Sequence, residues 1–279
     1  MGGFDHLHIG PVKIEYWNSV AEDLAKNGET NVYVTQSSPF DASETRAAQI
    51  AIQIDAILKK TGAAKVNLVG HSQGGLDARV LASPAGLGYG DRIASVTTIS
   101  TPHRGSRVAD VLLGLVSGLP TKTVDDVAEG LLRLIQKTSY DLQNDPKLRA
   151  QGMALSDEFT TKTFNVKYVD DNRVRYMSYA GRSNLQSGKG ICDTALYPNA
   201  PTKLDVAQPA VAALGLFLQE GEGKPNDGLV TVESAIWGQF MECMPADHLD
   251  EIGLPGTSLV FDHQAFYRQL VKRLRTSGL

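Results

Sequence analysis

Residues 70–74, Gly-His-Ser-Gln-Gly, have the types and spacing of a nucleophile held on a sharp turn. Small residues around Ser72 would let a strand and the helix after it approach each other closely. The backbone amide of Gln73 would then lie at the start of that helix, where it can donate a hydrogen bond to a developing oxyanion. Because so short a motif also occurs by chance, its weight depends on the other groups that the chain supplies.

A serine hydroxyl needs a general base, normally a histidine that a carboxylate orients. His248 is the preferred candidate because it lies late in the chain in a loop, and chains with this type of turn place the histidine after the acid. The other five histidines have different expected roles: His6 and His8 show no partner pattern, His71 should point away from the serine, His103 is a structural neighbour of the cleft, and His263 follows a helix-capping aspartate.

The acid should lie on a loop between the serine and the histidine. Asp227 stands in Pro-Asn-Asp-Gly at 225–228, which is a turn signal. Asp193 and Asp205 also precede His248, but neither lies at such a turn. Asp227 is therefore the preferred acid, and ordinary turn chemistry is the alternative explanation for it.

The elements that must position these groups alternate between strand and helix patterns. The sequence predicts strands at 31–35, 66–70, 93–101 and 174–181, and helices over 17–28, 43–60, from about 76, and from about 263 to 275. Such alternation is typical of an α/β fold with parallel strands and helices on both faces. Between 105 and 157 apolar helical stretches follow one another without a strand, which predicts a helical insert. Since no linker is visible, one domain over 1–279 is expected.

Composition excludes several classes of protein. The 279 residues include 27 Lys+Arg and 31 Asp+Glu, so the net charge of −4 argues against a nucleic-acid-binding protein. A hydrophobic share of 42% fits a globular chain. The sequence has no apolar run near the roughly 20 residues that span a bilayer. The first residues show no signal-peptide pattern, which does not by itself indicate a cytoplasmic protein.

Four segments together resemble the secreted bacterial triacylglycerol lipases of the α/β-hydrolase superfamily: 70–74 (GHSQG), 101–106 (TPHRGS), 226–230 (NDGLV) and 248–251 (HLDE). The resemblance covers nearly the whole chain. It implies cofactor-free hydrolysis of acylglycerol esters at a lipid–water interface, with the insert at 105–157 as a lid. Two alternatives stay open: a carboxylesterase for short-chain or polymeric esters, and a non-catalytic lipid- or partner-binding homologue.

The resemblance also implies features outside the three catalytic side chains. In the family a strand ending in His-Gly precedes a second oxyanion donor; here Met1 corresponds to that donor, and the sequence starts as if inside the motif. A structural calcium ion is implied, with Asp205 and Asp250 as its carboxylate ligands. A secreted location and a dedicated folding chaperone are further implied properties.

The two cysteines, Cys192 and Cys243, do not fall where the family's common disulfide is expected. An even pair nevertheless suits an exported protein, and Cys243 adjoins the histidine loop. Two buried thiols are the alternative. We expect the two cysteines to form a disulfide.

Overall fold

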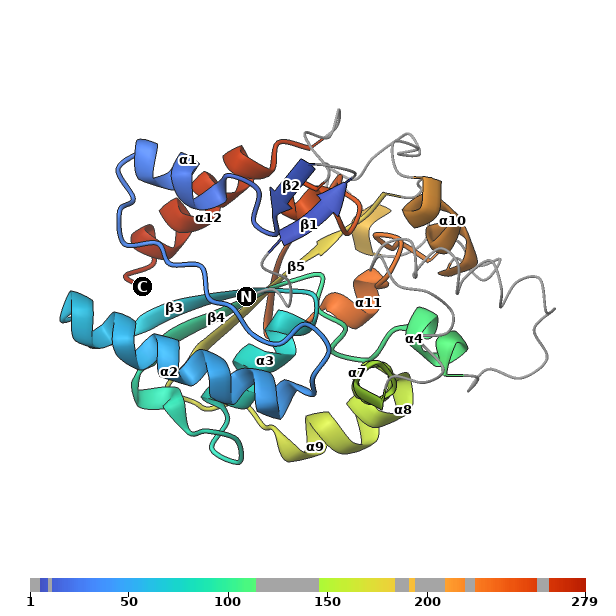
Figure 1. Cartoon of the computed structure of the whole chain (residues 1–279), viewed down its shortest axis with the longest axis horizontal. Helices are drawn as coiled ribbons and strands as arrows, with labels where there is room; N and C mark the ends of the chain where they lie inside the picture. The colour runs from blue at the N-terminus through green and yellow to red at the C-terminus, as the bar shows by residue number, and fades with distance from the viewer. Residues whose placement is uncertain are drawn as a thin grey trace.

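A four-stranded sheet forms the centre of the protein (Figure 1). The computed structural model describes residues 6–9, 12–113, 146–183, 191–193, 209–218, 224–254 and 261–279. The strands lie side by side in the order β3 (Val66–His71), β4 (Ile93–Ile99), β5 (Arg175–Gly181) and β6 (Gln239–Met244). Every neighbouring pair is parallel, which confirms the predicted α/β class. The carboxyl ends of these strands therefore meet at one edge, where such folds place their sites.

Helices cover both faces of this sheet. Among the described helices, α1 (Val20–Lys26), α2 (Ser43–Thr61), α3 (Gln73–Ala82) and α12 (His263–Thr276) pack against the two faces. Helices α2 and α3 pack into one core cluster with Leu68 and Val96 of the sheet. Helices α1 and α12 pack into a second cluster with Ile99, Met177 and Tyr179. Since Val96 and Ile99 belong to the same strand, the two clusters lie on its opposite faces.

The predicted helices form because their apolar residues share one stripe. In α2 the buried stripe includes Ala47, Ile50 and Ile54, and Gly62 ends the helix with a φ of 68°. Helix α12 begins at the predicted capping residue, since the Asp262 carboxylate accepts a hydrogen bond from the amide of Ala265 at 2.9 Å. Helix α3 begins at Gln73, three residues before the predicted start near Leu76.

The predicted strand at 31–35 is wrong. This segment forms no strand, and Val34 is 52% exposed. The backbone just after it bonds to glutamine side chains of α2 instead of a neighbouring strand: the amides of Gln36 and Ser38 donate to Gln53 and Gln49. A β-branched pattern thus needs a strand partner before it becomes a strand.

Several elements were not predicted. They are the antiparallel hairpin β1 (His6–Ile9) and β2 (Val12–Glu15), strand β6, helices α10 (Pro209–Leu218) and α11 (Val232–Ala235), and the short turns η1 (Tyr89–Asp91), η3 (Ile191–Asp193) and η4 (Asp250–Ile252). The hairpin is a separate sheet.

The predicted insert at 105–157 is helical where it is described. It begins with α4 (Arg107–Leu112) and ends with α7 (Pro146–Ala154), and 114–145 lie outside the described residues. A helical run then returns the chain to the sheet: α8 (Asp157–Phe159), the π-helical turn η2 (Thr160–Phe164) and α9 (Asn165–Lys167).

Cys192 and Cys243 form a disulfide, as predicted, and both are fully buried. The bond joins η3 to β6 inside a core cluster that also holds Ala180, Val230 and Val232. Among the described residues, no helix combines the length and the apolar character that crossing a membrane requires.

Candidate active site

Ser72 stands at the turn between β3 and α3, at the carboxyl edge of the sheet. Its backbone has a φ of 55° and a ψ of −134°, a conformation that residues other than glycine rarely adopt. The surrounding structure holds this conformation, because the Ser72 amide donates to the carbonyl of Ile99 and the Thr101 hydroxyl donates to the Ser72 carbonyl at 2.7 Å. The side chain is half-buried and therefore reachable.

Glycines allow the strand and the helix to approach closely at this turn. A Cβ on Gly70 would lie 2.6 Å from the carbonyl oxygen of Gly74. A Cβ on Gly75 would lie 2.0 Å from the Thr101 hydroxyl. The steric requirement therefore falls on Gly70, as expected from the motif, and on Gly75, the residue just beyond it.

The structure brings Asp227 and His248 together. Nδ1 of His248 lies 2.7 Å from a carboxylate oxygen of Asp227, and the His248 amide donates to the Asp227 carbonyl. The other carboxylate oxygen accepts from the amides of Leu229 and Val230. Both members of the pair are almost completely buried. A buried carboxylate with hydrogen bonds to both of its oxygens can orient an imidazole and stabilise its charged form.

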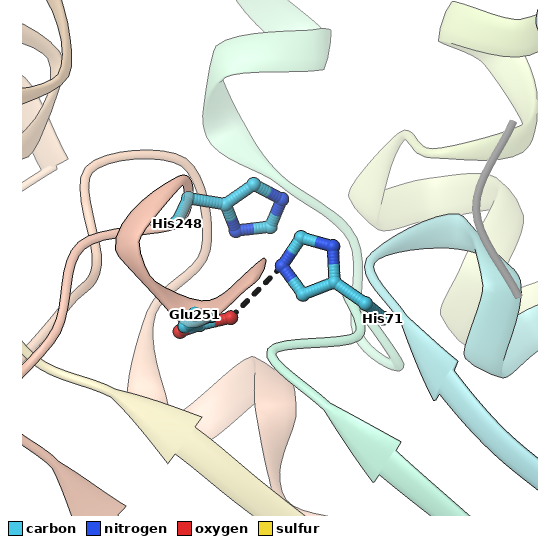
Figure 2. A group of neighbouring side chains, drawn as sticks. All are labelled: His71, His248 and Glu251. Atoms are coloured by element: carbon cyan, nitrogen blue, oxygen red, sulfur yellow. Dashed lines mark ion pairs between the residues drawn. The ribbon is translucent and has the colours of Figure 1, made fainter. Parts of the chain in front are cut away.

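The imidazole of His248 reaches the turn that carries Ser72. Its ring centroid lies 4.5 Å from that of His71, the residue just before the serine. Figure 2 shows the two rings next to each other, tilted by 45°, with Glu251 beside them. The acid and base chosen from the sequence are thus joined, and the ring of His248 contacts the residue just before the predicted nucleophile.

His71 does not belong to the predicted set, yet it is part of this environment. Its Nδ1 lies 2.7 Å from the Tyr16 hydroxyl, and its Nε2 lies 2.9 Å from a carboxylate oxygen of Glu251. Burial, and then the neighbouring His248, hold the pKa of His71 well below its usual range. Burial and the carboxylate of Asp227 raise the pKa of Glu251 well above its usual range. Glu251 belongs to the 248–251 segment singled out from the sequence, but nothing in the sequence related it to His71.

His103 and His263 both have structural contacts within the described residues. His103 is buried, contacts the Thr98 hydroxyl at 3.1 Å and stacks on Trp237. Burial, together with Arg79, keeps the pKa of His103 well below its usual range. His263 is buried against the carbonyl of Asn18.

Gln73 begins α3, so its amide is one of those that a helix leaves without an intrahelical partner. Its side chain has two further contacts: it donates to the carbonyl of Asp41 at 3.1 Å and accepts from Gln151 of α7 at 2.6 Å. Gln151 was not predicted, because nothing in the sequence relates it to residues so far away. Met1, the expected second oxyanion donor, lies outside the described residues.

The predicted calcium ligands are described only in part. Asp250 is buried in η4, where its amide donates to the Asp247 carboxylate at 2.8 Å, while Asp205 lies outside the described residues. In the described part of the chain, one group of three potential metal ligands occurs, and it consists of His71, His248 and Glu251. Calcium therefore stays a prediction.

Known proteins resemble this chain in sequence and in fold. A family model described as "alpha/beta hydrolase fold" matches residues 2–180. A triacylglycerol lipase of Vibrio cholerae is 33% identical over 99% of this chain and 86% of its own. One from Pseudomonas fragi is 29% identical over 99% of this chain and 94% of its own. The solved structure of lipase 1 from Pelosinus fermentans shares the fold, with a TM-score of 0.62 and 16% identity over 98% of this chain and 96% of that one. The chain therefore belongs to the α/β-hydrolase superfamily and, within it, to the triacylglycerol lipase family.

Proposed function

We propose that this protein hydrolyses the ester bonds of acylglycerols through an acyl-enzyme on Ser72. His248 acts as the general base, and the carboxylate of Asp227 orients it. The observation that carries the proposal is the 2.7 Å contact between His248 and Asp227, with the histidine ring against the turn that holds the serine. A binding protein would not need these three residue types at one edge of the sheet.

In the first step, the Ser72 oxygen attacks the ester carbonyl while its proton passes to Nε2 of His248. The tetrahedral oxyanion accepts a hydrogen bond from the amide of Gln73, with Met1 proposed as the second donor. The intermediate collapses as His248 gives the proton to the leaving alcohol. Water then repeats the sequence on the acyl-enzyme, transferring its proton to His248, and the fatty acid leaves as Ser72 recovers its hydrogen.

The direct test is covalent labelling of the protein with a fluorophosphonate, followed by mapping of the modified residue. We expect a single label on Ser72 and none in Ser72→Ala. That variant should lose hydrolysis by about 10⁶-fold while keeping its thermal stability. Labelling elsewhere, or activity close to that of the parent protein in Ser72→Ala, would overturn the proposal.

The substrate class is tested by comparing tributyrin and triolein emulsions with soluble butyrate esters. Long-chain hydrolysis that rises sharply once an oil–water interface forms is the expected result. Better turnover of soluble short-chain esters without that rise would indicate a carboxylesterase, and labelling without turnover of any ester would indicate a binding homologue.

The Cys192–Cys243 disulfide supports the proposal that the protein works outside the cytoplasm, because disulfides persist in oxidising compartments. Calcium at Asp205 and Asp250 is proposed from the family resemblance alone. A melting temperature of metal-stripped protein that does not change with millimolar calcium would exclude it. The folding chaperone also stays a prediction.

A further inference from the structure

A buried polar cluster lies behind His248, and the three catalytic side chains do not account for it. Its core is His71 and Glu251, which are 1% and 0% exposed. Burying such polar side chains costs free energy unless neighbouring groups satisfy them. The partners are therefore the first guide to what the cluster does.

The Tyr16 hydroxyl holds His71 from one side. Burial raises the pKa of Tyr16 far above its usual range, so the hydroxyl keeps its proton and donates it to Nδ1 of His71 at 2.7 Å. A neutral imidazole that accepts at Nδ1 carries its own proton on Nε2. That atom lies 2.9 Å from Glu251, at an angle outside hydrogen-bonding geometry, in the contact that Figure 2 marks with a dashed line. Tyr16 thus fixes both the tautomer and the rotation of the ring.

Glu251 is fastened to the sheet in its turn. The Ser100 hydroxyl at the end of β4 donates to one of its carboxylate oxygens at 2.5 Å, and the amide of Gly181 at the end of β5 donates to the same hydroxyl. The backbone carbonyl of Glu251 accepts from Tyr267 of α12. The side chain also lies so close to Gly181 that a Cβ there would be 2.0 Å from it. Through their 2.9 Å contact, His71 and Glu251 therefore form a buried support that joins β3, β4 and the histidine loop.

This support touches the proposed base. The rings of His71 and His248 lie 4.5 Å apart at an interplanar angle of 45°. The hydrogen bond to Asp227 restrains the His248 ring at Nδ1, but because a hydrogen bond tolerates a range of angles, the ring keeps some freedom to tilt. A second fixed surface against the ring removes that freedom. His71 supplies this surface.

We propose that His71, held by Tyr16 and Glu251, is a positioning residue that sets the plane of the His248 imidazole for proton transfer with Ser72. The inference rests on the proposed function, since it assigns His71 to the same base. Misplacing a catalytic group by about 1 Å can cost on the order of 10²-fold in rate.

The test measures kcat and KM for a soluble p-nitrophenyl ester, the rate of fluorophosphonate labelling, and the melting temperature. In His71→Ala we expect kcat and the labelling rate to fall about 10–100-fold, with KM changed by less than about twofold. His71→Phe restores a flat surface without the polar atoms, so we expect it to recover part of kcat. Glu251→Ala should lower kcat less, and the double variant should lose no more than His71→Ala alone.

His263→Ala is the matched control. His263 is also a buried histidine, hydrogen-bonded to the carbonyl of Asn18 and close to Gly253 at the far end of the histidine loop. Its replacement should lower the melting temperature while kcat stays within about twofold of the parent. If His71→Ala fails to fold, Tyr16→Phe removes the hydroxyl that holds Nδ1 and should lower kcat several-fold at unchanged KM.

The outcomes separate the two proposals. If the parent protein is not labelled at Ser72, the proposed function is wrong. If the parent is labelled there, but folded His71→Ala and Tyr16→Phe both keep its kcat and labelling rate, the positioning role alone is wrong. A loss that appears only in the melting temperature, as in His263→Ala, also overturns the positioning role.

Discussion

The two sides of Ser72 differ in how firmly the chain holds them. The histidine side, made of His248, Asp227, His71 and Glu251, is almost completely buried. Its contacts come from the ends of the central strands, the loops that follow them, Tyr16 and α12. The glutamine side is built around Gln73, which is also buried, but its side-chain partners Asp41 and Gln151 are only half-buried.

On the glutamine side, Gln151 of α7 donates to the Gln73 side chain and to the carbonyl of Pro39. An exposed ion pair between Lys147 and Asp41 adds to this contact. Single hydrogen bonds between side chains, and ion pairs at the surface, contribute little to stability. The proton-transfer groups therefore belong to the core, while the neighbourhood of the proposed oxyanion amide is tied to the insert by a few weak bonds.

Among changes within the two sides, the largest effect should come from Asp227→Asn on the histidine side. The asparagine oxygen can still accept from the amides of Leu229 and Val230, so we expect the fold to persist. Its amide group would face Nδ1 of His248 and favour the wrong tautomer, which costs about 10⁴-fold in kcat in serine proteases. Steady-state kinetics and a thermal melt check both parts. A loss below about tenfold would mean that another group orients the base.

The disulfide should matter for stability more than for chemistry. Cys192 and Cys243 close a loop with a sequence separation of 51, and a cross-link of this kind typically contributes about 2–4 kcal/mol. We expect urea denaturation of the double variant Cys192→Ser with Cys243→Ser to show a free energy of unfolding that is lower by about 2–4 kcal/mol. The variant should still hydrolyse esters normally at low temperature. A parallel loss of kcat at low temperature would show that β6 holds the histidine side in place through this bond.

A smaller effect is expected for Gln151→Ala on the glutamine side. The change removes hydrogen bonds to Gln73 and Pro39 from a half-buried site, so it should cost about 0.5–1.5 kcal/mol of unfolding free energy. We expect kcat on soluble esters to change by less than about fivefold. Gln239→Ala, which breaks an exposed bond to Arg175, is the control. A loss of activity as large as that of Asp227→Asn would erase the difference between the two sides.

The smallest effect should depend on pH. Asp157 follows α7, and burial, with the nearby Asp110, raises its pKa to about 6. The folded protein therefore holds this proton more tightly than the unfolded chain does, so its stabilising contribution is present below about pH 4 and is lost as pH rises through about 6.

Asp157→Asn should accordingly raise the melting temperature at pH 8 and leave it unchanged near pH 4. Since the side chain is partly exposed, we expect a gain below about 1 kcal/mol, or about 1–3 °C. Glu158→Gln, one residue further along, serves as the control and should show no such difference between the two pH values. An equal effect of Asp157→Asn at both pH values would contradict this assignment.

The sequence predicted the parts of the site that depend on local patterns. The turn at Ser72 lies between a strand and a helix that adjoin it directly. The turn at Asp227 is indicated by the sequence Pro-Asn-Asp-Gly at 225–228. The expected order of the acid and the histidine then selected His248. Each of these inferences needed only a short stretch of residues or their order.

What escaped prediction depends on pairing across the chain. Glu251 meets His71 and Ser100 because the fold brings the ends of β3 and β4 to the histidine loop. Strand β6, with the sequence Gln-Phe-Met-Glu-Cys-Met, has no clear alternation and is a strand because β5 lies beside it. The segment at 31–35 has the composition of a strand but lacks such a neighbour. Tertiary context decides all three cases.

The backbone at Ser72 has one more consequence. A residue held at a φ of 55° and a ψ of −134° costs on the order of 1–3 kcal/mol, which a glycine would largely avoid. The same exchange would delete the hydroxyl on which hydrolysis depends. Selection for thermal robustness and selection for turnover therefore oppose each other at this residue, so a laboratory evolution experiment that rewards heat resistance alone should accumulate glycine at position 72.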